Sequence, residues 1–279
     1  MNFKDKTVII TGGSEGVGAA TARAFASAGA NLVLVARRKR KLEIIADELR
    51  GKTRVEIFAM DVADADACAN LFKKAQFEFG DIHILINNAG YHVRKPVEMT
   101  DPDDLCRMID VNLKAPILLT RLALPHIRES GEGAIINVAS LAGRTPLAGA
   151  AAYGASKFGL RAFTFALADE IPDSKIKLAV VSPGTIDTGF VMDNLDDVMD
   201  INFSQPISTA EEVAEAILEL CSNSKREHAM PAASGFLTTL TYLFPWIRRT
   251  MRPILERKGR AVKRRLLAEQ QRAKREIPD

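Results

Sequence analysis

The first 180 residues of the chain alternate short apolar runs with longer segments of helical periodicity. Most of the runs are continuous stretches of Val, Ile and Leu, as expected of strands in a parallel sheet that is covered on both faces. We therefore predict strands over residues 7–11, 31–36, 54–60, 82–87, 134–140 and 177–182.

The segments between these runs have the spacing of amphipathic helices. The expected helices span residues 16–28, 38–50, 64–79, 101–128 and 151–171. We expect Pro116 and Pro125 to bend or interrupt the fourth of them. Repeated strand–helix units predict an α/β fold with a doubly wound parallel sheet, the Rossmann fold, in three α/β/α layers. Ligands of such sheets bind beyond the carboxyl ends of the strands.

The pattern changes after residue 182. Residues 183–207 are rich in loops, and a helix is expected over residues 209–221 with Thr209 as its N-cap. We predict a catalytic domain over residues 1–230, including a lid over residues 189–207, and a C-terminal extension over residues 231–279. Four aspartates lie in the lid without His or Cys partners, and we interpret them as a solvated, mobile surface rather than a metal site: Asp193, Asp196, Asp197 and Asp200.

Composition and charge narrow the class of protein. The chain is 47% hydrophobic and 26% charged, which suits a soluble globular protein with a sizeable core. Its three cysteines and four histidines lack metal-ligand spacing, so we expect no metal site, and the cysteines fit a reducing compartment. The N-terminal residues lack the pattern of a secretory signal, so we expect a cytoplasmic protein.

A glycine-rich turn follows the first apolar run, in the sequence TGGSEGVG of residues 11–18. Glycines at a strand-to-helix turn let backbone N–H groups and the positive end of a helix approach a pyrophosphate. The alternative is an ordinary glycine-rich turn. The strand before it and the small-residue helix after it favour dinucleotide binding.

The end of the second strand bears on the choice of cofactor. Arg37 and Arg38 stand where an arginine would meet a ribose 2′-phosphate and an acidic residue would meet a 2′-hydroxyl. NADP(H) is therefore favoured. Glu15 argues against it, because it places a carboxylate in the phosphate-binding turn, and NAD(H) stays the alternative.

Tyr153 and Lys157 lie four residues apart on the predicted helix 151–171 and so share one of its faces. A nearby ammonium group favours the phenolate and lowers the pKa of a tyrosine, which can then exchange protons nearer neutral pH. Taken alone, this spacing is more often that of a surface pair.

Further motifs accompany this pair at the expected strand ends. Asn112 lies in the sequence MIDVN of residues 108–112, Ser140 ends the fifth run, and the segments 87–90 and 183–188 follow the fourth and sixth runs. Together they resemble the short-chain dehydrogenase/reductase family over residues 5–225, in the family's order and spacing.

The resemblance implies a role for each matching position in binding the cofactor. The residues that would bind the adenosine ribose and pyrophosphate are Thr11, Gly12, Ser14, Glu15, Gly16, Val17 and Gly18. Those that would contact adenine or support the cofactor are Asp61, Val62, Asn88, Ala89 and Gly90. Those around the carboxamide would be Pro183, Gly184, Ile186 and Thr188.

The resemblance also implies the catalytic set. Asn112 would organise a water that passes protons to Lys157, and Lys157 would bind the nicotinamide ribose and lower the pKa of Tyr153. Tyr153, which would also contact the cofactor, would exchange a proton with the substrate. Ser140 would hydrogen-bond the substrate carbonyl. The family further implies a dimer or tetramer.

The lid and the extension bear on substrate and partners. Phe190 and other apolar lid residues favour an apolar, lipid- or steroid-like carbonyl or alcohol substrate, such as a long-chain keto lipid, although they could simply pack the lid. Residues 235–247 are apolar and too short to span a bilayer. Residues 248–279 carry twelve basic and four acidic side chains, a net charge of +8, which leaves −5 for residues 1–247 of a chain whose total is +3.

This arrangement favours peripheral contact with an anionic membrane surface, at its inner or cytosolic face. The alternatives are packing over the active site, a dimer contact or a solvated helix; nucleic-acid binding does not explain the apolar run. The leading hypothesis for function is an NADPH-dependent ketone reductase. The competing hypotheses are a cofactor-binding regulator without catalysis and a membrane-associated scaffold.

Overall fold

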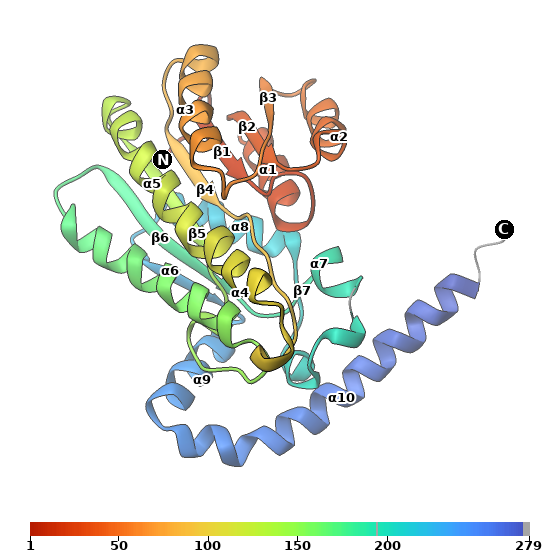
Figure 1. The fold of residues 1–279 in the computed structure, drawn as a ribbon. Helices are drawn as coiled ribbons and strands as arrows, with labels where there is room; N and C mark the ends of the chain where they lie inside the picture. Colours follow the sequence, from red (N-terminus) through yellow and green to blue (C-terminus); the bar gives the residue numbers. More distant parts are fainter. Residues whose placement is uncertain (194, 276–279) are drawn as a thin grey trace.

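The computed structural model describes residues 1–193 and 195–275, with side chains up to residue 272. Residue 194 of the predicted lid and residues 276–279 of the predicted extension therefore lie outside the described residues. Seven parallel strands form one sheet in the order β3-β2-β1-β4-β5-β6-β9 (Figure 1). Their bounds are β1 (Thr7–Thr11), β2 (Asn31–Ala36), β3 (Val55–Ala59), β4 (Ile84–Asn87), β5 (Gly133–Val138), β6 (Ile176–Pro183) and β9 (Glu227–Met230).

Helices cover both faces of this sheet, which confirms the predicted three-layer Rossmann fold. One face is covered by α1 (Gly16–Ser27), α2 (Lys39–Leu49) and α8 (Ala210–Ser222). The other is covered by α3 (Ala65–Phe79), α5 (Ala115–Glu129) and α6 (Ala151–Glu170). Thr209 caps α8 by accepting a hydrogen bond from Glu212 N, as the sequence predicts.

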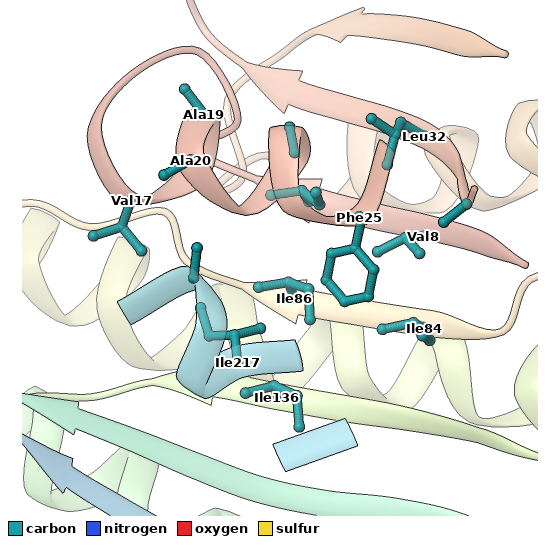
Figure 2. Close-up of a cluster of buried hydrophobic side chains, with 14 of the residues drawn as sticks. Val8, Val17, Ala19, Ala20, Phe25, Leu32, Ile84, Ile86, Ile136 and Ile217 are labelled. Carbon is teal, nitrogen blue, oxygen red and sulfur yellow. The ribbon is translucent and has the colours of Figure 1, made fainter. Parts of the chain in front are cut away.

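Two hydrophobic cores explain why the central residues of the strands are apolar on both faces of the sheet. In β1, Val8 and Ile10 pack into the core beneath α1 and α8, while Ile9 packs into the core beneath α3 and α5. Figure 2 shows the first core, where Phe25 of α1 lies among strand residues that include Ile84. Burial on both faces therefore replaces the polar alternation of a one-sided sheet.

The long helix expected over residues 101–128 is two helices. α4 (Pro102–Ile109) and α5 are joined by a π-helical turn, η2 (Asp110–Lys114), so the break precedes both prolines. Pro116 lies in the first turn of α5, where a missing N–H leaves no bond unmade. Pro125 lies inside α5 without ending it. The predicted interruption is therefore found in the turn that precedes Pro116, whereas the prediction is wrong for Pro125.

The end of β5 and the presence of a seventh strand also differ from the prediction. β5 ends at Val138, and Ser140 is instead the N-cap of a short 3₁₀ helix, η3 (Leu141–Gly143), where its hydroxyl accepts a hydrogen bond from Ala142 N. The edge strand β9 was not predicted. Its sequence, EHAM, has little β-propensity, and its pairing with β6 makes it a strand.

The lid packs against the C-terminal extension. It contains α7 (Gly189–Met192), η4 (Leu195–Asp197) and η5 (Asp200–Ser204), whereas the extension forms α9 (Ala232–Leu243) and α10 (Pro245–Arg275). A short pair of strands, β7 (Ile186–Asp187) and β8 (Ser208–Thr209), closes the base of the lid. Figure 1 shows α10 running alongside the elements of the lid. Apolar lid residues form a third core with residues 262, 266 and 267 of α10.

Polar contacts and one glycine hold α10 to the lid. A Cβ on Gly259 would lie 1.8 Å from the carbonyl oxygen of Asp200, so only glycine permits this approach. Arg260 pairs with the Asp200 carboxylate at 2.9 Å, and Lys263 Nζ donates to the backbone oxygen of Val198 at 2.7 Å. The interpretation of the lid aspartates as a solvated surface is therefore wrong for Asp200. The division of the chain at residue 230 stays a prediction.

Candidate active site

A large cavity, of about 1220 Å³, lies beyond the carboxyl ends of the strands. It is bounded by the glycine-rich turn, by the segments after β4, β5 and β6, by the start of α6, by the lid and by the extension. The topology therefore brings the predicted site residues to one place, although they span residues 11–190 of the sequence.

The glycine-rich turn forms one end of the cavity. Gly12 has φ +67, and a Cβ there would lie 2.8 Å from Asn88 Nδ2. A Cβ on Gly18 would lie 2.0 Å from the Gly12 carbonyl oxygen. Asn88 Nδ2 donates to Thr11 O at 2.9 Å, which ties the end of β1 to the end of β4. The close contacts leave the space in front of α1 for a ligand.

The residues predicted in this turn divide into two groups. Gly12, Ser14, Glu15, Gly16 and Val17 line the cavity. Thr11 and Gly18 lie behind them, where the Thr11 hydroxyl donates to Ile86 O and accepts from the backbone N–H groups of residues 88 and 89. Thr11 and Gly18 therefore support the backbone of the turn and do not form the cavity wall.

Two cationic side chains near the end of β2 form ion pairs with a carboxylate of the glycine-rich turn. Glu15 forms ion pairs with Arg38 and Lys41. Burial acts to raise the pKa of Glu15, but the hydrogen bonds and charges of Lys41 and Arg38 outweigh it and hold the pKa below its usual value. Arg37 also lines this part of the cavity. Two cations thus converge on a carboxylate beside the turn.

Asp61 lies after β3, as predicted, and its carboxylate is held from two sides. It pairs with Arg107 and accepts a hydrogen bond from Ala63 N at 2.9 Å. Val62 lines the cavity beside it. Among the segments that follow β4, Ala89 and Gly90 also line the cavity together with Asn88.

Tyr153 and Lys157 lie on α6 and line the cavity, and Ser140 faces them from the end of η3. Burial raises the pKa of Tyr153 above its usual value, while a hydrogen bond from Ser140 and the charge of Arg94 act in the opposite direction. Lys157 is only 4% exposed, and its ammonium donates to Val138 O at 2.8 Å. Burial lowers the pKa of Lys157 to about 8.

Asn112 lies in the π-helical turn and is fully buried. Its Oδ1 accepts from Tyr91 N at 2.8 Å, and its Nδ2 donates to Tyr91 O at 2.8 Å and to Ser156 Oγ at 3.2 Å. The side chain therefore fastens the segment after β4 to α6. Its predicted role in a proton relay stays a prediction.

Three side chains in or beside the site were not assigned to it from the sequence. The His92 ring stacks on the Tyr153 ring with centroids 3.9 Å apart, and burial lowers the pKa of His92 to about 3. Arg94 lines the cavity nearby. Arg144 pairs with Glu227 beneath η3 and donates to Thr239 Oγ1 of α9 at 2.7 Å. His92 and Arg94 lie in a loop, where no periodic pattern marks them as site residues. Their position beside Tyr153 and in the cavity wall follows from the fold.

The far side of the cavity is formed by the segment after β6, the lid and the extension. Of the predicted residues, Pro183, Gly184, Ile186, Thr188 and Phe190 line it. The extension adds lining residues that the sequence did not identify: Ser234, Leu237, Thr238, Thr241, Arg248, Arg249, Met251, Arg252 and Leu255. The extension therefore packs over the site, one of the alternatives considered for it.

The family model for short chain dehydrogenases matches residues 6–199, which include the glycine-rich turn and the Tyr153–Lys157 pair. The chain belongs to this family. It is an oxidoreductase whose relatives include dehydrogenases and reductases, in agreement with the resemblance found in its motifs.

Three similar proteins place the chain within the short chain dehydrogenases. An uncharacterized oxidoreductase of Staphylococcus saprophyticus is 40% identical over 189 residues, which cover 67% of this chain and 76% of the relative. An NADP-dependent 3-hydroxy acid dehydrogenase of Schizosaccharomyces pombe is 36% identical over 225 residues, 76% of this chain and 85% of the relative. A crystal structure of a metagenomic short-chain oxidoreductase in complex with NADP has 30% identity and a TM-score of 0.70, and it covers 82% of this chain and 98% of the other.

Proposed function

We propose that this short chain dehydrogenase is an NADP(H)-dependent oxidoreductase that interconverts a ketone and a secondary alcohol on an apolar substrate. The observation that carries the proposal is the meeting of Tyr153 and Ser140 in the same cavity as the glycine-rich turn. The cavity thus contains a phenol that could donate a proton, a second hydroxyl group and a glycine-rich turn that would bind a dinucleotide.

The residues present fit a dinucleotide. Glycines at 12 and 18 keep open a turn that Cβ atoms would fill, and the first turn of α1 points its N–H groups toward the cavity. Arg38 and Lys41, now paired with Glu15, are the cations available to a 2′-phosphate, with Arg37 beside them. The NADP complex of the metagenomic relative and the name of the fission-yeast relative support the same choice.

The protein groups would handle the charge and the proton. When bound, the cofactor supplies or accepts the hydride. Negative charge then develops on the carbonyl oxygen, where Ser140 and Tyr153 would donate hydrogen bonds and Tyr153 would deliver its proton. Lys157 would hold the nicotinamide ribose. Its ammonium would also supply the proton that restores the phenol of Tyr153 after Tyr153 has protonated the substrate. Ile186 and Thr188 would hold the carboxamide.

The substrate class rests on the walls of the cavity. Leu141, Leu147, Met199 and Ile201 line the cavity, together with Leu237 of α9. Apolar walls of this kind favour a substrate with a hydrocarbon body. A long-chain keto lipid or a steroid-like ketone fits this description.

The test is the oxidation of NADPH and of NADH by purified protein with a panel of apolar ketones. We expect turnover with NADPH, and a loss of about 10²- to 10⁴-fold in kcat in Tyr153→Phe, the range for removing a general acid. Cofactor binding without turnover of any carbonyl would support the regulator instead. A Tyr153→Phe variant with full activity would refute the assigned chemistry.

A second role, peripheral membrane contact, is favoured by the exposed corner between α9 and α10. Its aromatic and aliphatic side chains are largely in solvent: Phe236 (73% exposed), Leu243 (62%), Phe244 (47%) and Trp246 (66%). Among the described residues, no helix is both long and apolar enough to cross a bilayer. We therefore propose contact with an anionic surface through this corner and the adjacent arginines.

Co-sedimentation with anionic vesicles tests this contact. Wild type should sediment with them, and Phe236→Ser combined with Trp246→Ser should not, whereas equal recovery of both would refute it. The dimer or tetramer and the cytoplasmic location stay predictions.

A further inference from the structure

Arg94 occupies the wall of the cavity beside the proposed catalytic tyrosine. Its guanidinium donates one hydrogen bond, to Phe190 O at 2.9 Å, and its Cζ lies 4.9 Å from the centroid of the Phe190 ring. Its positive charge acts on Tyr153 and opposes the rise in the pKa of that residue. Arg94 and Tyr153 line the same cavity, and the Tyr153 ring stacks on His92, two residues before Arg94 in the chain. The guanidinium therefore lies on the side of the cavity where the substrate carbonyl would be.

The charge of Arg94 lacks a direct partner within the described part of the chain, where no carboxylate forms an ion pair with it. The other arginines that line the cavity fall into two groups. Arg38, Arg107 and Arg252 pair with Glu15, Asp61 and Glu256, whereas Arg37, Arg248 and Arg249 form no ion pair among the described residues. Asp197 favours the charged form of Arg94 only from a longer distance, and burial lowers the pKa of Arg94. A guanidinium carries five N–H donors, and a single acceptor satisfies one of them here.

The cavity that Arg94 lines combines apolar side chains with further positive charge. Arg248 and Arg249 of α10 line the same cavity, and Asp193 is the acidic side chain on the lid that lines it. A negatively charged group on a bound ligand would stabilise the partly buried guanidinium of Arg94. A purely hydrocarbon ketone would leave Arg94 without one.

We propose that Arg94 binds an anionic group, a carboxylate, of the substrate, so that the substrates of this enzyme are amphipathic oxo acids or hydroxy acids. This inference rests on the proposed function and narrows its substrate class. Because the charge of Arg94 reaches Tyr153, the carboxylate lies toward the carbonyl end of the molecule. The hydrocarbon body lies along the apolar walls formed by the lid and the extension.

A structural role for Arg94 competes with this one, since its contacts with Phe190 would also fasten the lid. The two roles differ in what they predict for a neutral substrate. Loss of a lid contact weakens the turnover of acids and of neutral analogues alike, whereas loss of a carboxylate partner affects the acid. The ratio between a matched acid and ester therefore separates them.

The experiment uses oxodecanoates that differ in the position of the ketone, each paired with its methyl ester, and NADPH as reductant. For wild type we expect a higher kcat/KM for the acid at one or more ketone positions. Arg94→Met should lower the acid-to-ester ratio of kcat/KM by about 10- to 100-fold, the effect of a lost charged hydrogen bond. Arg94→Lys should retain much of the preference, because it keeps the charge. Arg121→Met, at an exposed residue of α5 away from the cavity, is the matched control.

A binding measurement keeps the inference separate from the proposed function. Calorimetric titration with decanoate and with decanol, in the presence of NADP⁺, needs no turnover. Decanoate should bind wild type more tightly than Arg94→Met, and decanol should not distinguish the two proteins. Equal effects on acid and ester, or on decanoate and decanol, would overturn the anion site. If decanoate binding depends on Arg94 but no ketone is reduced, the proposed function fails instead.

Discussion

Replacing Glu227 by glutamine, a change of nearly equal size, should substantially lower the free energy of unfolding. Its side chain is 13% exposed and its carboxylate pairs with Arg144 and Arg161, whose side chains are 12% and 30% exposed. It also accepts a hydrogen bond from Ser182 Oγ at 2.7 Å. Glu227→Gln keeps the shape but removes the charge, leaving two guanidinium groups without a carboxylate.

The expected loss of stability is about 3 kcal/mol, the lower end of the range for breaking a buried ion pair by removing one partner. For a chain of this size that corresponds to a fall of roughly 6–12 °C in Tm. The matched control is Asp169→Asn, the same change in a pair with Arg226 in which the side chains are 66% and 57% exposed. That variant should lose less than about 1 kcal/mol.

The pH dependence adds a second check on Glu227. Burial acts to raise its pKa, but hydrogen bonds from Arg161, Arg144 and Ser182 outweigh this and lower it below the usual 4.5. A carboxyl group with a depressed pKa in the folded state stabilises the fold above its unfolded pKa, and this contribution is lost as the pH falls through the folded pKa.

Urea unfolding of wild type and Glu227→Gln from pH 8 to pH 3 measures both effects. The difference in unfolding free energy should be constant above about pH 5 and shrink below it. A loss no larger than that of Asp169→Asn, or a difference unchanged down to pH 3, would refute the assignment of a stabilising buried pair.

Three further predictions concern the cofactor turn and the extension. Gly18→Ala should weaken NADPH binding by at least about 10-fold in a fluorescence titration, because its Cβ would lie 2.0 Å from a backbone oxygen of the turn. Glu15→Gln should tighten NADPH binding but leave NADH binding nearly unchanged in the same titration, because it releases the two cations that Glu15 now pairs. Gly259→Val should separate α10 from the carbonyl of Asp200, raising KM more than it lowers kcat and increasing hydrogen exchange in η5.

The sequence predicted the parallel sheet and the glycine-rich turn because both depend on local patterns. Continuous apolar runs reflect burial on two faces, as in β1 and β4. Glycines and a capping threonine mark turns and helix starts by their own conformational preferences. For this reason the predicted helices over residues 16–28, 38–50, 64–79, 151–171 and 209–221 have boundaries within a few residues of those observed.

The features that were missed depend on distant partners. β9 begins with Glu227, whose charge argues against a buried strand until Arg144 and Arg161 are brought beside it. Arg94 lies in a loop, and nothing in its neighbouring sequence distinguishes it from a solvated arginine. Ser140 was placed at a strand end, whereas its hydroxyl caps a 3₁₀ turn, a distinction that requires backbone geometry.

The contact between the lid and α10 was partly within reach of the sequence. An acidic lid and a basic tail were both evident, and their pairing through Asp200 and Arg260 follows from opposite charge. The register of that contact could not be predicted from the sequence, because it depends on the close approach of Gly259 to the carbonyl group of Asp200 in η5.

The placement of α9 and α10 over the cavity has a consequence for how such an enzyme diversifies. The groups proposed to carry the chemistry lie in η2, at the start of η3 and on α6, within the part matched by the family model, which ends at residue 199. Much of the wall that would face the substrate body comes from residues 234–255, beyond that part. Exchange of this segment between homologues can therefore alter which molecule is accepted while the reactive centre is inherited unchanged.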